Sequence, residues 1–176
     1  MGYFSLTADT KGSKSVAIGT AALGDQNFTT ATDTFNVAIG QEAGRSITAG
    51  AFNNLIGGLA GDAITTGGTN VAVGFTALGT DTVGSKSAAV GAYALATQNP
   101  STATDMYNTG IGYRALSANI DGDKNTVLGY NAMEANTTAD NMVAIGAQAL
   151  QANTTGAFNT AVGYDALNDN VTTSGN

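Results

Sequence analysis

One short phrase recurs along the chain at a nearly fixed distance. It consists of a polar residue, any residue, a small residue, an aliphatic residue and glycine, and it first occurs at Ser15 to Gly19. The nine copies end at the anchor glycines Gly19, Gly40, Gly57, Gly74, Gly91, Gly112, Gly129, Gly146 and Gly163. Neighbouring anchor glycines are 17 residues apart except at two steps of 21, and Gly2 fits a tenth copy. A fixed period of this kind predicts a repeat architecture.

The two longer steps carry related insertions of four residues. The first falls within Gln26 to Asn36 and the second within Gln98 to Asn108. The insertions lie 72 residues apart, as do two GSKS segments that begin at Gly12 and Gly84. A parallel stack cannot absorb extra residues inside a coil. We therefore expect two loops that leave the same edge of the stack, roughly 19 Å apart at one strand spacing per coil.

Each repeat favours short strands over helix. Alanine follows every anchor glycine from Gly19 onwards by three residues, and Leu or Met comes next in seven of the nine copies. Apolar residues alternate with polar or small ones over four or five positions, as in strands, and glycine turns interrupt any helical stripe. The sequence therefore predicts an all-β parallel β-solenoid of about ten 17-residue coils. It forms one domain over residues 1–176, either complete or part of a longer fibre.

Each slot of the repeat predicts a place in the coil. We expect the aliphatic residue before each anchor glycine, and the later Leu, to point into a thin core, where each contributes ~1.5 to 3 kcal/mol. The repeated alanine fits where the coil is narrowest, and the anchor glycine where the backbone turns through angles closed to residues with a Cβ. Asparagine at the start of the phrase, as at Asn36 and Asn53, is expected to stack into a ladder of side-chain amides.

Composition excludes most chemical functions. The chain has no Cys and no His, so it lacks the usual nucleophile, general base and metal ligands. Its net charge of -7, without any basic cluster, opposes binding to nucleic acid. No segment is apolar enough to cross a bilayer or to act as a secretory signal. We expect no enzyme activity, no cofactor, no metal, no nucleic-acid partner and no membrane insertion.

Several short motifs are explained by the repeat itself. Gly110, Gly112 and Ala115 spell GxGxxA, but no helix is expected to follow that could bind a dinucleotide. Asp121 and Asp123 flank a glycine turn that offers too few oxygens for calcium. Four N-x-T sequons recur in the same turn of the repeat: Asn27, eight residues after its anchor glycine, and Asn136, Asn153 and Asn170, seven residues after theirs. Paired threonines beside them leave an ice-binding solenoid as an alternative.

Aromatic residues gather in two slots and provide the candidate interaction residues. A narrow coil cannot hold these rings, so they are expected outside, as a seam between chains or a glycan-stacking surface. The rings are Phe75, Tyr113, Tyr130 and Tyr164 just after anchor glycines, with Phe35 and Tyr107 just before the Asn slot. Asp33 and Asp105 in the insertions are expected to accept hydrogen bonds from a receptor glycan or a neighbouring chain. A tolerated loop without a partner is the alternative.

The repeat phrases resemble those of known fibrous proteins. SVAIG at Ser15, NVAIG at Asn36, NVAVG at Asn70 and NTAVG at Asn159 resemble head repeats of trimeric autotransporter adhesins. The longer NTAVGYDAL at Asn159, with its NTT turns, is similar to repeats in bacteriophage tail fibres and adhesin-like shafts. The resemblance implies a left-handed coil and a homotrimer. The coil is longer than in the adhesin head, and without a signal peptide, stalk or anchor we do not expect a complete autotransporter.

These observations together predict a structural protein. We expect a rigid fibre or adhesin-like shaft, on a virion or at a cell surface, that presents loops for attachment to a host surface or glycan. Its partners would be copies of itself, as a homotrimer or an end-to-end filament. The alternative of another class is an extracellular filament that self-assembles without a receptor.

Overall fold

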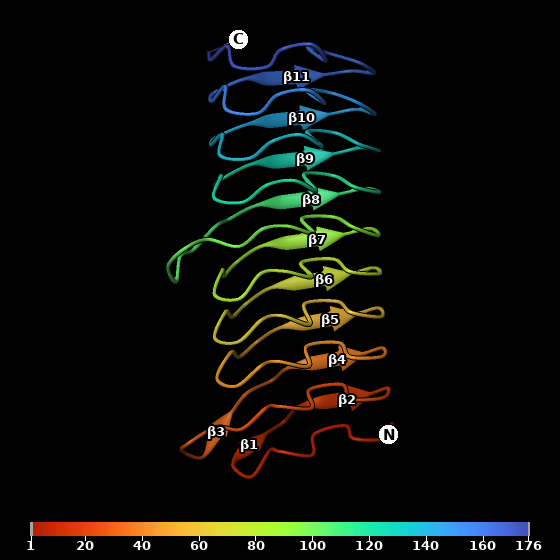
Figure 1. Ribbon diagram of the computed structural model, residues 1–176, viewed down its shortest axis with the longest axis vertical. Coiled ribbons are helices and arrows are strands. Elements are labelled where there is room, and N and C mark those ends of the chain that lie inside the picture. The colour runs from red at the N-terminus through yellow and green to blue at the C-terminus, as the bar shows by residue number, and fades with distance from the viewer. Residues whose placement is uncertain (1, 176) are drawn as a thin grey trace.

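The computed structural model describes residues 2–175 and shows a rod of stacked coils with its two ends far apart (Figure 1). Each coil contributes one short strand to a parallel sheet, and the described residues contain no helix. This confirms the predicted all-β parallel solenoid, with about nine turns instead of ten. The repeat that begins at Gly2 bonds to the next coil through its backbone but adds no strand to the sheet.

The main sheet has nine strands in sequence order, and all neighbouring strands are parallel. Its strands are β2 (Val16–Ile18), β4 (Val37–Ile39), β5 (Asn54–Ile56), β6 (Val71–Val73), β7 (Ala88–Val90), β8 (Thr109–Ile111), β9 (Thr126–Leu128), β10 (Val143–Ile145) and β11 (Thr160–Val162). Equivalent slots pair throughout, as in Ala38 with Leu55 and Ile39 with Ile56. The register is therefore that of the sequence repeat. A second sheet joins only β1 (Gly12–Ser13) and β3 (Thr32–Asp33).

The rest of each coil consists of turns that also bond to the next coil. The Gly61 amide donates to Ala77 at 2.9 Å, and the Thr137 amide donates to Thr154 at 3.0 Å. Residues two and four positions after the anchor glycine turn the chain with positive φ, as at Tyr93 (60°) and Leu95 (50°). The stack is thus held by hydrogen bonds along the rod in the turns as well as in the sheet.

The core is narrow and built from small residues. The alanine three positions after the anchor glycine is fully buried in eight coils, and the following Leu or Met is buried beside it in most of them. Where Gly44 and Gly61 replace that Leu, Ile47 and Ile64 fill the space three residues later. A Cβ on Gly44 would lie only 2.6 Å from Leu55 Cδ1. A smaller residue at one position is therefore compensated by a larger one nearby, so that the core stays closely packed.

The strands correct one prediction. The aliphatic residue before each anchor glycine was expected inside, but it faces outward: Ile39 is 36% exposed and Ile111 38%. The small middle residue of each strand, such as Ala38, is buried instead. Successive side chains of a strand point to opposite faces, and the thin core accepts only the small one of each triplet. Leu and Ala after the glycine do face inward, as expected.

The anchor glycines are required by close stacking as well as by backbone angle. Gly112 has φ of 134°, which side-chain-bearing residues rarely adopt. A Cβ placed there would lie 2.4 Å from the Gly129 carbonyl oxygen in the next coil. The predicted backbone angle is confirmed, and the contact between coils is a second reason for glycine.

The asparagine ladder exists, but its bonds differ from the expected amide stack. Asn36 Oδ1 accepts from the Asn53 backbone N–H at 2.9 Å, and Asn53 Oδ1 accepts from that of Asn70 at 3.0 Å. Each Nδ2 instead donates to a turn carbonyl, as Asn53 does to Gly67 at 3.0 Å. The buried amides therefore tie side chain to backbone from coil to coil, and they leave few polar groups of the turns unpaired.

Candidate functional site

The outer face of the nine-stranded sheet is an exposed apolar surface. Each strand points two residues outward, and of these eighteen none is charged and fourteen are apolar. The polar members are Asn54, Thr109, Thr126 and Thr160. Exposed members include Ile18 at 49%, Leu128 at 45% and Val162 at 67%. At one strand spacing per coil the face is roughly 40 Å tall. We call it the sheet face, and its size exceeds the scattered apolar exposure usual on a monomer.

A row of rings borders the sheet face on the side of the anchor glycines. The ring centroids lie 5.6 Å apart for Phe75 and Tyr93, 6.0 Å for Tyr93 and Tyr113, and 5.8 Å for Tyr113 and Tyr130. These contacts join four coils into one aromatic row. Tyr164 is 76% exposed and is separated from the row by the coil that carries Ala147.

Sequence reasoning missed Tyr93. It stands two residues after its anchor glycine, while the other rings of the row stand one residue after. The missing signal was geometric: a ring in the neighbouring slot of the same turn reaches the same row. Its contacts to Phe75 and Tyr113 are both edge-to-face, whereas Tyr113 and Tyr130 are stacked.

Rings and lysines share a single slot on the opposite border of the sheet face. Phe35 and Phe52 stack with their centroids 5.6 Å apart. Lys14 Nζ lies 5.0 Å from the centroid of Phe35, one coil further along, and Lys86 Nζ lies 5.2 Å from that of Tyr107. Both distances fit cation–π contacts. Phe35 and Tyr107, which the sequence proposed as stacking rings, thus already stack with groups of their own chain.

Each insertion loop folds back onto the turn of the preceding coil. Both loops leave the same edge of the rod, as predicted (Figure 1). In the first loop, β3 pairs with β1. In the second, Ser85 and Asp105 form an isolated parallel bridge. The two GSKS segments are therefore the turns that receive the loops, which explains why both motifs recur at the same distance.

The two candidate aspartates close these loops. Lys14 Nζ lies 2.6 Å from Asp33 Oδ2, and Lys86 Nζ lies 2.6 Å from Asp105 Oδ2. Ser13 Oγ also donates to Asp33, at 2.7 Å. We call each set of loop aspartate, GSKS lysine and ring a clasp. The carboxylates that were expected to accept bonds from a receptor are bonded within the chain.

Electrostatics at the clasps follow from these contacts. The hydrogen bond from Lys14, helped by Ser13, holds the pKa of Asp33 below its ordinary value. The hydrogen bond from Lys86 lowers the pKa of Asp105 in the same way, and the pKa of Lys86 is raised in return. Both carboxylates therefore remain ionised at and below neutral pH.

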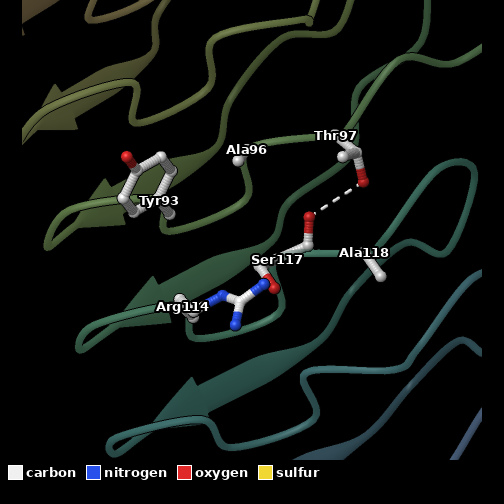
Figure 2. A pocket seen from close by; sticks show the side chains of 6 residues that line it. All are labelled: Tyr93, Ala96, Thr97, Arg114, Ser117 and Ala118. Carbon is white, nitrogen blue, oxygen red and sulfur yellow. Dashed lines mark hydrogen bonds between the residues drawn. The ribbon is translucent and has the colours of Figure 1, made fainter.

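A hollow of about 260 Å³ lies between the coils of β7 and β8, outside the sheet face (Figure 2). It is lined by Tyr93, Ala96, Thr97, Arg114, Ser117 and Ala118. In Figure 2 the Arg114 side chain extends toward Ser117. Ala96 and Ala118 carry only a methyl group and leave the space open. No sequence motif indicated this hollow.

Other sequence candidates lose their chemical meaning in the structure. Asn136 and Asn153 belong to a column of buried polar side chains and are not open to glycosylation, whereas the sequon residue Asn27 is exposed. The Thr137 hydroxyl donates to the Thr154 carbonyl at 3.1 Å, as part of the stack. Among residues 2–175, no three acidic side chains gather as metal ligands. No helix within that range is long and apolar enough to span a membrane.

Comparisons with known proteins do not assign the chain to a family. No family model matches the sequence, and no curated protein or solved structure matches the chain. The sheet face, the aromatic row, the clasps and the hollow are therefore interpreted from their own geometry.

Proposed function

We propose that the protein is the shaft of a structural fibre or adhesin-like appendage, without catalytic activity, which acts on a virion or at a cell surface. Its sheet face packs against copies of the same chain, as a homotrimer. Its loops and turns face outward and attach the assembly to a host surface or glycan.

The uncharged sheet face carries the proposal. The strand triplets with a border slot on each side, one of which carries Lys14, Lys86 and Lys124, cover roughly 600 to 800 Å². This area matches what one partner contributes to a stable interface. A copy of the same chain has the same spacing between coils, so the row of Val, Ile and Leu residues before the anchor glycines, such as Ile39, can interdigitate with its counterpart along the rod. An unrelated globular partner would lack this periodicity.

Three substitutions in one coil test the assembly. Ile145→Asp places a charge on the sheet face and should convert the assembly into folded monomers, because an unpaired charge is costly to bury between chains. Thr155→Asp is exposed in the same coil, away from the sheet face, and should leave the mass unchanged. Ala144→Asp, at a fully buried position, should unfold the coil. Sedimentation equilibrium gives the mass, and far-UV circular dichroism gives the fold.

The proposal fails if the wild-type chain sediments as a monomer, or if Ile145→Asp sediments like Thr155→Asp. A wild-type mass that is a different small multiple of the chain mass would correct the copy number. Particles of unbounded length would instead favour the self-assembling filament.

Loop presentation requires a separate test. Removing four residues from each insertion restores 17-residue coils and should leave the sheet face, the assembly mass and the fold unchanged, because the loops lie at another edge (Figure 1). Binding to host cells or to immobilised glycans should fall. Unchanged binding would show that the loops take no part in attachment.

A further inference from the structure

The hollow between the coils of β7 and β8 arises from the residues at three positions of the turn, which lie two, five and six residues after the anchor glycine. Two positions after the anchor glycine, these coils carry the large side chains Tyr93 and Arg114. Five and six positions after it they carry Ala96 with Thr97, and Ser117 with Ala118. The next two coils carry Glu134 and Gln151 in the fifth slot. The result is a wall of two large side chains beside a floor of small ones.

The hollow exposes polar groups that the fold itself does not use. Ser117 is only 8% exposed, yet its hydroxyl has no hydrogen-bond partner among the described residues. The Thr97 hydroxyl, in contrast, donates to the Ser117 carbonyl at 2.8 Å. The Ser117 hydroxyl is accessible from the hollow, because the buried side-chain atoms without a partner among the described residues are Asn131 Oδ1 and Asn153 Oδ1, so it can bond to a ligand in place of water.

An ion pair stands at the rim of the hollow. Arg114 Nη1 lies 2.8 Å from Glu134 Oε1, and the guanidinium retains further N–H donors. Tyr93 adds a ring, and its hydroxyl has no partner within residues 2–175. The Arg114 donors, the Ser117 hydroxyl and the Tyr93 ring therefore line a space of about 260 Å³. Glu134 lies beside it, held by Arg114 and by Gln151, whose Nε2 donates to Glu134 Oε2 at 2.9 Å.

We propose that this hollow binds one neutral pyranose residue of a glycan. A sugar hydroxyl both donates and accepts, so a single hydroxyl can accept from Arg114 and donate to Glu134, and its neighbour can bond to Ser117. The apolar side of the ring then lies against Tyr93. The volume is below the range of pockets for drug-sized ligands, which fits one sugar ring.

The charge balance selects a neutral sugar. A carboxylate only accepts hydrogen bonds, and Glu134 together with the net charge of -7 repels it. A ligand of this size binds with a Kd on the order of 1 mM per site, so useful attachment depends on several copies acting together. The inference therefore rests on the proposed attachment role, which it refines by naming a site and a ligand class.

Saturation-transfer NMR on the wild-type assembly tests the site, with methyl glycosides of glucose, galactose and mannose as neutral probes and methyl glucuronide as the anionic probe. At least one neutral glycoside should bind, and the glucuronide should bind at least tenfold more weakly. Ala118→Leu fills the floor and should weaken binding at least tenfold. Ala152→Leu makes the same change in the same slot two coils on, outside the hollow, and should have no effect. Ser117→Ala should weaken binding several-fold without changing the fold.

Several results would overturn the inference. They are the absence of binding by every neutral glycoside at millimolar concentration, preferential binding of the glucuronide, or equal loss in the Ala118→Leu and Ala152→Leu variants. If no glycoside binds and Ala118→Leu alone changes the sedimenting mass, the hollow is a contact between chains. If no sugar binds but the wild-type chain still forms an assembly of constant mass, only the sugar site is wrong and the proposed shaft function stands. If the wild-type chain is monomeric, the proposed function itself is wrong.

Discussion

At the scale of the residue, stacking places each side chain next to the residues at the same position of the repeat in the coils before and after it. Equivalent slots recur at about 4.8 Å along the rod, so a group that fits once must fit in every coil. Tyr93, Leu95 and Lys86 hold left-handed φ values of 60°, 50° and 60° without being glycine. Each such residue costs ~1 to 2 kcal/mol in isolation. The hydrogen bonds and buried surface between coils offset that cost, so a single coil is not stable alone.

The anchor glycines provide a direct test of stacking. Gly112→Ala brings a Cβ to 2.4 Å from the carbonyl oxygen of Gly129, whereas at Gly163, with φ of 130°, only the Ala166 Cβ lies near, at 4.0 Å. Gly163→Ala should therefore cost only the backbone strain, ~1 to 3 kcal/mol. Gly112→Ala should cost clearly more. Denaturant unfolding compares the two, and equal losses would show that backbone angle alone requires glycine.

The buried Asp81 should make the stability of the fold depend on pH in an unusual way. It is fully buried, and burial raises its pKa above the ordinary 3.8 although Gln98 and the Gly84 amide donate to it. The fold thus binds this proton more tightly than the unfolded chain does. Its contribution to stability is least favourable at neutral pH, improves as pH falls through the raised pKa, and levels off below about 3.8.

Asp81→Asn isolates that contribution, because Asn119 and Asn136 occupy the same slot in later coils. The variant should melt a few degrees above wild type at pH 7. The difference in melting temperature between the variant and the wild type should become smaller as the pH falls toward 4. Thermal unfolding across this range checks it, and a gap independent of pH would contradict the assignment.

At the scale of the element, the insertion loops show how a solenoid accommodates extra residues. Part of each insertion enters the stack, where Phe28 and Met106 are nearly buried. The remainder is closed by a clasp, with Asp105 on Lys86 and the ring of Tyr107 beneath it. Each loop thus needs a partner turn one coil earlier, which is why the GSKS segments and the insertions occur together.

Lys86→Met should loosen the second loop without unfolding the rod. An exposed ion pair contributes little to the free energy of unfolding, so the melting temperature should scarcely change. The Met106 amide, which donates to the Ser85 carbonyl at 2.9 Å, should exchange about two- to fivefold faster. Lys124→Met is the control, because the Lys124 side chain fills the same slot but pairs with its neighbour Asp123 and with no loop aspartate. The substitution keeps the bond from the Lys124 backbone N–H to the Met106 carbonyl. Equal effects of both variants on Met106 would exclude the clasp.

At the scale of the whole molecule, the period of the repeat predicts the fold almost completely. Strand positions, register, loops on one edge and exposed rings follow from slots that recur every 17 residues. The outward direction of the Ile39 side chain could not be predicted from the repeat. Alternation within a strand of three residues allows either the middle residue or its two neighbours to face the core, and only the thickness of the core decides between them. The clasp of Lys14 with Asp33 did not follow either, since it joins different slots of adjacent coils. The hollow depends on side-chain sizes across three slots, which no motif records.

The hydrogen bonds between coils run along the rod, whereas the covalent chain runs around it, and this arrangement determines how the rod responds to pulling. Tension along the axis is carried by the ladders of the sheet and the turns together, from coil to coil as from β7 to β8, and not by the peptide bonds. A coil that yields releases 17 residues, or roughly 55 Å of extended chain, in place of about 5 Å of rod. A stretched rod should therefore lengthen in discrete steps about tenfold the height of a coil before the connection between its two ends breaks.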